Sequence, residues 1–430
     1  MTAASFGWAV AAWALAAEPE QRVLSLDEAL ASAEANQPQL RQAAANAEAA
    51  QARAGQARAP LLPQVRTSAS YERSTGNASV RLGIPGATST GRSGTFDFYR
   101  LNATASQLIY DFGQSWNRYQ ASRATAEGQA QTQEAVRLSA RLNVRLAYFN
   151  ARAQHSLVQV ARETLENEDL RLRQIRAFVE VGVRPEIDLA QQRTTQANAR
   201  VQFIQAENDY LTAKAQLNQA MGVEGPLDYQ VAPVTLPPVA GEEGEIDALV
   251  SEALDRRPEY ASRLKQVEAQ ARTVRSARGA YLPGLTASVG VSEAGTQPSN
   301  LNFTAYGQLG LSWSLFEGLL TFSQVKEAQA SLRAAEADRD ILRQQTRLEL
   351  EQARLSVRAA RASIGASEDA ATNARERLRL AEGRYRAGAG NVIELGDAQV
   401  ALTNAAAQQV QAEYNLATAR AQLLQRLGRP

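Results

Sequence analysis

The sequence has no cysteine, a single histidine and only three lysines among its 430 residues. The absence of cysteine excludes disulfides, thiolate metal ligands and thiol nucleophiles. The histidine, His155, lies in the middle of a long helical pattern, so we interpret it as structural rather than catalytic. Because no cluster of histidines or cysteines can form a zinc site, we expect no bound metal and no cofactor.

An excess of charge of one sign is also missing. The formal net charge is +1, and aromatic residues make up 6% of the chain. A near-neutral chain has no electrostatic footprint for a phosphate backbone, so we expect no nucleic-acid partner. Neither a phosphate-binding G-x-x-x-x-G-K-[ST] loop nor a G-x-S-x-G nucleophile motif occurs. These absences argue against an enzyme.

Apolar runs long enough for a membrane helix of about 20 residues are lacking as well. The short run from Phe6 to Leu15 precedes an A-x-A sequence, Ala14-Leu15-Ala16, and the polar residue Glu18. This order is typical of a secretory signal, which we predict for residues 1–17. The alternative is an alanine-rich N-terminus without structure.

The chain is internally duplicated. Leu26-Asp27 recurs as Ile246-Asp247 and Leu62-Pro63 as Leu282-Pro283, both 220 residues later. Further along the offset is 206, since Gly182 matches Gly388 and Gly222 matches Gly428. We therefore predict a first repeat over 18–225, a linker over 226–245 and a second repeat over 246–430. The 14-residue difference indicates a longer loop in the first repeat, between about residues 72 and 100.

Each repeat begins with a helix that a proline ends. In the first repeat, Ser25 and Glu28 form a capping box, and the pattern predicts one helix to about Ala59. Its counterpart is expected over 246–279. Pro63 and Pro283 then mark the junctions between helix and strand.

Two stretches of alternating sequence follow each junction. Apolar or small residues alternate with polar ones at period two, which predicts strands with one apolar and one polar face. The predicted strands cover about 62–72, 97–110, 284–293 and 302–315. Such strands cannot stand alone in a bilayer, because their edges would leave backbone groups unpaired. A closed barrel needs at least eight strands, so two, three or four copies would have to share one barrel.

Long helical patterns without proline follow the strands. The first covers about 114–180, or about 100 Å at 1.5 Å per residue. Return helices are expected over 186–221 and 392–427, after a tight turn at a glycine. Helices of this length must project away from so small a sheet.

The duplicated order resembles the TolC-type outer-membrane efflux proteins over essentially the whole mature chain. The strongest support is the pair of turn motifs in register, Val181-Gly182-Val183-Arg184-Pro185-Glu186-Ile187-Asp188-Leu189 and Arg384-Tyr385-Arg386-Ala387-Gly388-Ala389-Gly390-Asn391-Val392-Ile393-Glu394-Leu395-Gly396-Asp397-Ala398-Gln399.

This resemblance implies an α+β membrane protein in which four amphipathic strands per chain contribute to a trimeric 12-stranded transmembrane β-barrel. A long α-helical barrel would continue it into the periplasm of a Gram-negative bacterium. It also implies the exit duct of a tripartite efflux pump or of a type I secretion system. The implied partners are two further copies of the chain, outer-membrane lipid, a periplasmic adaptor (membrane fusion protein) and an inner-membrane RND or ABC transporter.

The resemblance also assigns roles to the two turns. In the family, the hairpin tips dock the adaptor, which points to Val181, Gly182 and Val183 and to their counterparts Ala387, Gly388 and Ala389. The alternative is a plain helix-turn-helix glycine that only permits the reversal.

Four further positions match the family's periplasmic aperture. Asp188 and Tyr385 match residues that hold it closed, and Glu394 and Asp397 match acids that ring it. Three residues apart, the two acids share a helix face and could select cations, although a solvated face would carry the same residues. The best-known members have an arginine where this chain has Gly390, which suggests a weaker gate or a different partner.

Two other functions remain to be weighed against a passive duct. A periplasmic adaptor also has helical hairpins, but it usually has one, and its lipoyl-like domains have no counterpart here. A soluble coiled-coil scaffold would have neither the strands nor the interruptions at Pro63 and Pro283.

Overall fold

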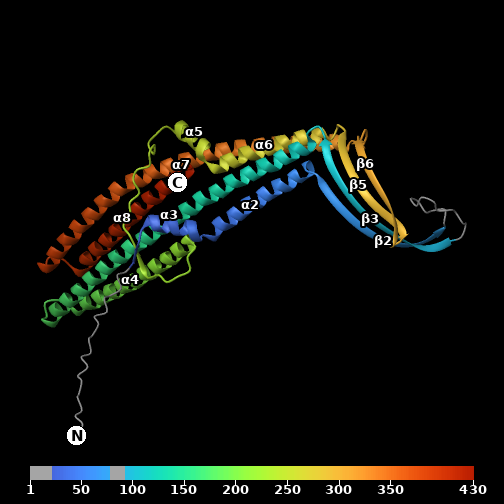
Figure 1. The fold of residues 1–430 in the computed structure, drawn as a ribbon. Coiled ribbons are helices and arrows are strands. Elements are labelled where there is room, and N and C mark those ends of the chain that lie inside the picture. Colours follow the sequence, from blue (N-terminus) through green and yellow to red (C-terminus); the bar gives the residue numbers. More distant parts are fainter. Residues whose placement is uncertain (1–21, 78–92) are drawn as a thin grey trace, which may run out of the picture. The chain divides into compact units, whose positions relative to one another are not determined.

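A computed structural model describes residues 22–77 and 93–430 (Figure 1). The predicted signal segment 1–17 and most of the predicted longer loop, residues 78–92, lie outside the described residues. The described residues form two compact units, one from residues 22–38, 139–242 and 353–425, the other from 39–77, 93–138, 243–352 and 426–430. We call them the helical unit and the strand unit. Neither unit is one of the predicted repeats, because each takes segments from both.

Two helices of 67 residues, each about 100 Å long, supply residues to both units. They are α3 (Gln114–Glu180) and α7 (Leu320–Arg386). Their return helices are α4 (Glu186–Met221) and α8 (Val392–Arg426). None of the helices within 22–77 and 93–430 has a stretch long and apolar enough to cross a membrane.

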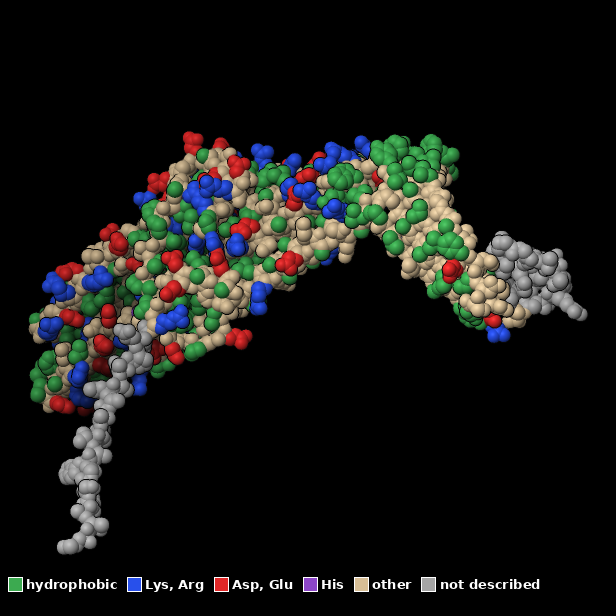
Figure 2. All heavy atoms as spheres, viewed as in Figure 1, with side chains coloured by type: hydrophobic (Ala, Val, Ile, Leu, Met, Phe, Trp, Pro, Cys, Tyr) green, Lys and Arg blue, Asp and Glu red, His purple; other side chains and the backbone are tan. Residues whose placement is uncertain are grey.

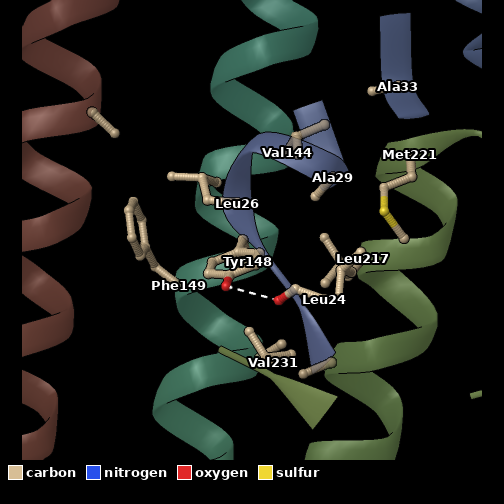
Figure 3. Close-up of a cluster of buried hydrophobic side chains, with 13 residues drawn as sticks. Leu24, Leu26, Ala29, Ala33, Val144, Tyr148, Phe149, Leu217, Met221 and Val231 are labelled. Atoms are coloured by element: carbon tan, nitrogen blue, oxygen red, sulfur yellow. Dashed lines mark hydrogen bonds between the residues drawn. The ribbon is translucent and has the colours of Figure 1, made fainter. Parts of the chain in front are cut away.

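The core of the helical unit surrounds a short parallel sheet. Its strands are β1 (Arg22–Leu24) and β4 (Tyr229–Val231), which lies inside the predicted linker. The Tyr148 hydroxyl on α3 lies 3.1 Å from the carbonyl oxygen of Leu24 (Figure 3). It lies 3.0 Å from the carbonyl oxygen of Ala232. The core around Tyr148 includes Val144, Phe149, Leu217, Met221 and Val231. Burial raises the pKa of the Tyr148 phenol to about 12.

The prediction of one uninterrupted helix up to Ala59 is wrong. The structure has α1 (Leu26–Asn36) and α2 (Pro38–Arg58), separated by an extended Gln37 with φ −64° and ψ 117°. A residue before proline avoids the helical region, and proline fits the first position of a new helix. The second repeat breaks in the same way at Arg257, between α5 (Ile246–Arg256) and α6 (Pro258–Gly279).

The strand unit contains one antiparallel sheet in the order β2-β3-β5-β6. Its strands are β2 (Gln64–Asn77), β3 (Ser93–Tyr110), β5 (Gly284–Gln297) and β6 (Asn300–Ser312). All four are longer than predicted at their hairpin ends. At the other end β6 stops at Ser312, opposite Gly284, so the predicted residues 313–315 lie beyond it. Pro283, just before Gly284, has no N–H to extend that ladder.

Alternation along the strands gives the sheet two distinct faces. Val65, Leu309 and Leu311 on the apolar face are 73%, 72% and 68% exposed. Figure 2 shows hydrophobic side chains over the sheet, where acidic and basic side chains are sparse. An exposed apolar sheet face of this kind calls for an apolar environment such as lipid.

Candidate functional site

The first hairpin tip joins α3 to α4. Gly182 has a φ of 75°, which glycine adopts without strain. Its N–H donates to the carbonyl of Val179 at 3.0 Å, and the N–H of Val183 donates to that of Phe178 at 2.9 Å. This closes the last turn of α3, and Pro185 is the extended residue that precedes α4.

The second tip, between α7 and α8, repeats this pattern 206 residues later. Gly388 has a φ of 76°, and its N–H donates to the carbonyl of Tyr385 at 3.1 Å. The N–H of Ala389 donates to the carbonyl of Arg384 at 3.0 Å. Asn391 then caps α8, since its side-chain oxygen accepts the N–H of Glu394 at 2.7 Å.

The predicted docking residues form an exposed, largely apolar surface. Val181 and Val183 are 71% and 68% exposed, and Ala387, Gly388 and Ala389 are exposed as well. Ile187 and Ile393, just past the two tips, are 71% and 63% exposed. Valines and isoleucines this exposed at a chain reversal do not stabilise the hairpin itself.

Behind the tips, the predicted residues Asp188 and Tyr385 are both buried. Burial raises the pKa of the Tyr385 phenol, and the nearby Asp188 carboxylate raises it further. In the described part of the chain, the Tyr385 hydroxyl has no hydrogen-bond partner of ordinary geometry. The ring and Leu395 belong to a small apolar core at this end of the hairpins.

Arg184 connects the two hairpins at this point. Its guanidinium carbon lies 4.4 Å from the centre of the Tyr385 ring, and it donates a 2.9 Å hydrogen bond to the Tyr385 carbonyl. The matching position in the second tip is Gly390, where a Cβ would lie 3.1 Å from the Tyr385 nitrogen. Any side chain there would require this backbone to shift by a few tenths of an ångström.

A buried ionic cluster also joins the hairpins. Arg171 of α3 donates to Glu168 at 3.1 Å and to Glu382 of α7 at 2.7 Å. Gln192 of α4 donates to the other oxygen of Glu168. Since Glu168 and Arg171 are 1% and 8% exposed, their charges are largely removed from water.

The two predicted ring acids differ in their surroundings. Glu394 lies 3.3 Å from Arg384, in an ion pair whose side chains are 41% and 60% exposed. Asp397 is exposed and forms no ion pair with any residue that the structure describes. The two acids are therefore not equivalent, because Arg384 neutralises part of the Glu394 charge.

The sequence profile of the outer membrane efflux protein family matches residues 29–223 and 249–429, most of the chain. The chain belongs to this family. It is 26% identical over 415 residues to the toluene efflux pump outer membrane protein TtgF of Pseudomonas putida, covering 93% of this chain and 82% of that protein. It is 25% identical over 394 residues to the outer membrane protein TolC of Escherichia coli, with 88% and 77% covered.

Solved structures of outer-membrane channels share the fold. The CmeC channel of Campylobacter jejuni superposes with a TM-score of 0.83 at 21% identity, covering 94% of this chain and 85% of that one. VceC of Vibrio cholerae gives 0.82 at 19% identity, with 94% and 96% covered. These comparisons confirm the predicted family and fold class.

As an outer membrane efflux protein, the chain is an exit duct of the outer membrane with a helical periplasmic part. Members of the family are passive channels, and the reading as an adaptor or a soluble scaffold is not favoured.

The remaining predicted positions of this efflux protein lie where the sequence pattern puts them. Pro63 and Pro283 directly precede β2 and β5. At the first junction Gln64 donates to the carbonyl of Ala59 at 2.9 Å, and at the second Trp313 donates to that of Tyr281 at 3.0 Å. No three acidic or histidine side chains within 22–77 and 93–430 form a group that could hold a metal ion.

Sequence reasoning missed three residues that join the hairpins of this efflux protein: Arg171, Arg184 and Glu382. Arg184 lay inside the quoted tip motif, but nothing in the motif tells which ring it covers. Arg171 and Glu168 have a helical i, i+3 spacing, which is common on solvated faces. Their partner Glu382 lies 211 residues further along the chain.

Proposed function

We propose that three copies of this chain form one closed channel whose hairpin tips bind a periplasmic adaptor, with an inner-membrane RND or ABC transporter completing the pump. The observation that carries the proposal is the pair of tips, which repeat one hydrogen-bonded turn and expose Val181, Val183 and their neighbours. Exposed apolar side chains at the end of a protein mark a contact surface.

The open sheet calls for more than one copy. Each chain contributes four strands, and among the described residues the outer edges of β2 and β6 pair with no strand. An open edge in lipid would leave backbone N–H and C=O groups unsatisfied, so the sheet must close with strands from other copies. Three copies give the 12-stranded barrel of the family resemblance, with the apolar face toward outer-membrane lipid.

The channel test uses the whole protein. It should fractionate with the outer membrane, run in detergent at the size of a trimer and give conductance in planar bilayers. Recovery of a soluble, folded monomer would contradict the proposal.

The docking surface can be tested by polar substitution. Val183→Ser removes an exposed apolar contact at the tip without touching a buried group, so cross-linking to the adaptor should fall. The matched control is Val201→Ser, because Val201 lies on α4 itself and is 54% exposed. Equal cross-linking by both variants would rule Val183 out of the docking surface.

We further propose that Asp188, Tyr385, Glu394 and Asp397 form the periplasmic gate, with Arg184 as the arginine that holds it closed. The contact of Arg184 with both the ring and the carbonyl of Tyr385 supports this role. In a trimer, the exposed acids near the second tip would surround the axis and attract polyvalent cations.

The acids are tested by channel block. Replacing Glu394 and Asp397 together by alanine should weaken the block of the current by di- and trivalent cations. Asp397→Ala alone should weaken it more than Glu394→Ala, because Arg384 already pairs with Glu394. Unchanged block in the double variant would remove both acids from the gate.

For the cargo, we propose small organic molecules rather than secreted proteins. Relatives are named for toluene efflux, antibiotic efflux and pyoverdine export. A strain without this chain should accumulate such a solute but still secrete proteins, and the opposite result would favour type I secretion.

A further inference from the structure

The polar face of the β2-β3-β5-β6 sheet carries more positive than negative charge, and all of it lies on β2 and β3. Among the described strand residues on this face, the charged side chains are Arg66, Arg100 and Glu72, and all three are exposed. The strands β5 and β6 add only uncharged residues to it, among them Thr286, Ser288, Ser292, Thr304, Tyr306 and Gln308.

Neither arginine is neutralised by a carboxylate. Within 22–77 and 93–430, Arg66 and Arg100 form no ion pair. The Arg100 guanidinium carbon lies 5.2 Å from the centre of the Phe98 ring, a contact that leaves its charge intact. The contrast is Arg73, also on β2 but on the opposite face, which lies 3.8 Å from Asp97.

Arg66 belongs to a row of residues that crosses all four strands. It is opposite Thr104, which is opposite Gly290, which is opposite Tyr306. A Cβ on Gly290 would lie 2.7 Å from the phenol end of Tyr306, so this ring lies flat against the sheet. Its hydroxyl is 3.2 Å from the Thr104 hydroxyl. Because the Tyr306 ring lies against the sheet, Arg66 is the one long charged side chain in this row of four residues.

We propose that the strand end of this duct is an anion-preferring filter, in which Arg66 and Arg100 bind polyvalent oxyanions. The proposal rests on the proposed trimer, since closing the barrel turns the polar face inward. The described strands of each copy then bring two arginines and one glutamate to the lumen. Charged rings of this kind select ions, and the planar guanidinium matches oxyanion geometry with two parallel hydrogen bonds.

The test is block of the single-channel current by inorganic tripolyphosphate added to the strand side of a planar bilayer. The orientation of each channel is determined first: the side from which a trivalent cation blocks the current is the tip side, and the other side is the strand side. Wild-type current should be blocked, and the double variant Arg66→Gln, Arg100→Gln should raise the half-blocking concentration about tenfold. The control Arg73→Gln changes an arginine on the other face of β2 and should leave block unchanged.

A conservative variant separates charge from folding. The change Arg66→Lys keeps the positive charge and should keep most of the block, even if the double variant fails to assemble. Wild-type channels that tripolyphosphate does not block, or equal block in the double variant and the wild type, would overturn the filter. Absence of any wild-type channel would instead contradict the proposed trimeric duct.

Discussion

The ion pair between Arg171 and Glu382 allows a direct test of how the two hairpins are held together. Arg171 on α3 donates to Glu168, three residues earlier on the same helix, and to Glu382 on α7. The substitution Glu382→Gln keeps the shape of the side chain and removes its charge. Arg171 then still has Glu168, so no buried charge is left without a partner.

The magnitude follows from burial. The Glu382 side chain is 32% exposed, against 9% for Arg171, so its charge is only partly screened. Losing this charge-assisted bond should cost about 1–2 kcal/mol, less than the 3–5 kcal/mol for breaking a fully buried pair. The bond to Glu168 survives any separation of the hairpins, so only the bond to Glu382 distinguishes closed from open. The equilibrium should therefore move toward open by about 5–30-fold.

The assay is the open probability of single channels in planar bilayers. Glu376→Gln is the matched control: it makes the same substitution on the same helix, in an exposed pair with Arg379 whose side chains are 55% and 68% exposed. Exposed pairs of this kind contribute little, so the control should behave as wild type. If Glu382→Gln opens no more often than the control, the cluster stabilises the hairpins without holding them closed.

Three predictions concern the helical unit. Tyr148→Phe removes a buried hydroxyl between two carbonyls and should lower the free energy of unfolding by about 1–2 kcal/mol, measured by denaturation in detergent. Because the pKa of Tyr148 is raised to about 12, its neutral hydroxyl stabilises the fold fully below pH 10, and this stabilisation is lost as the pH rises through 12. Over that range the free energy of unfolding should fall more in the wild type than in the Phe variant. Gly222→Ala should lower the free energy of unfolding by about 3 kcal/mol, because its Cβ would lie 2.7 Å from the Gln37 backbone. Gly182→Ala, whose Cβ would meet no atom within 4 Å, should lower it by about 1 kcal/mol. Equal losses of stability in the two variants would contradict this reasoning.

The strands and tips were predictable because their signals are local. Period-two alternation shows which residues share a face, and a glycine between two long helical patterns marks a reversal. The break at Gln37 has a local signal in Pro38, which the prediction of a single helix overlooked, but the contacts that hold the kink are not local. The Gln37 side chain donates to the carbonyls of Gln219 and Ala220 at 3.3 and 2.9 Å, and Gly222 packs against its backbone. Contacts 182 residues away therefore stabilise the kink that Pro38 permits.

Two other features depend on long-range pairing in the same way. The neighbours β3 and β5 come from different repeats, and nothing local to either strand indicates that they pair. The strands β1 and β4 have three residues each, too few for a period to be recognised. Within the candidate site, the pairing of Arg171 with Glu382 was hidden for the same reason, whereas the exposed tip residues could be identified from their motif.

The two tips share one backbone turn but differ in their contacts with the residues of the proposed gate. Arg184 of the first tip reaches the ring and carbonyl of Tyr385, whereas its counterpart in the second tip is Gly390, with little room for a side chain. The sequence suggested a weaker gate because an arginine is missing at 390. The geometry supports a different interpretation, in which the first hairpin supplies the arginine. Arg171 likewise reaches from the first hairpin to Glu382 on α7, so both contacts end on the same helix of the second hairpin. Any opening that separates the hairpins must then release α7 from both arginines.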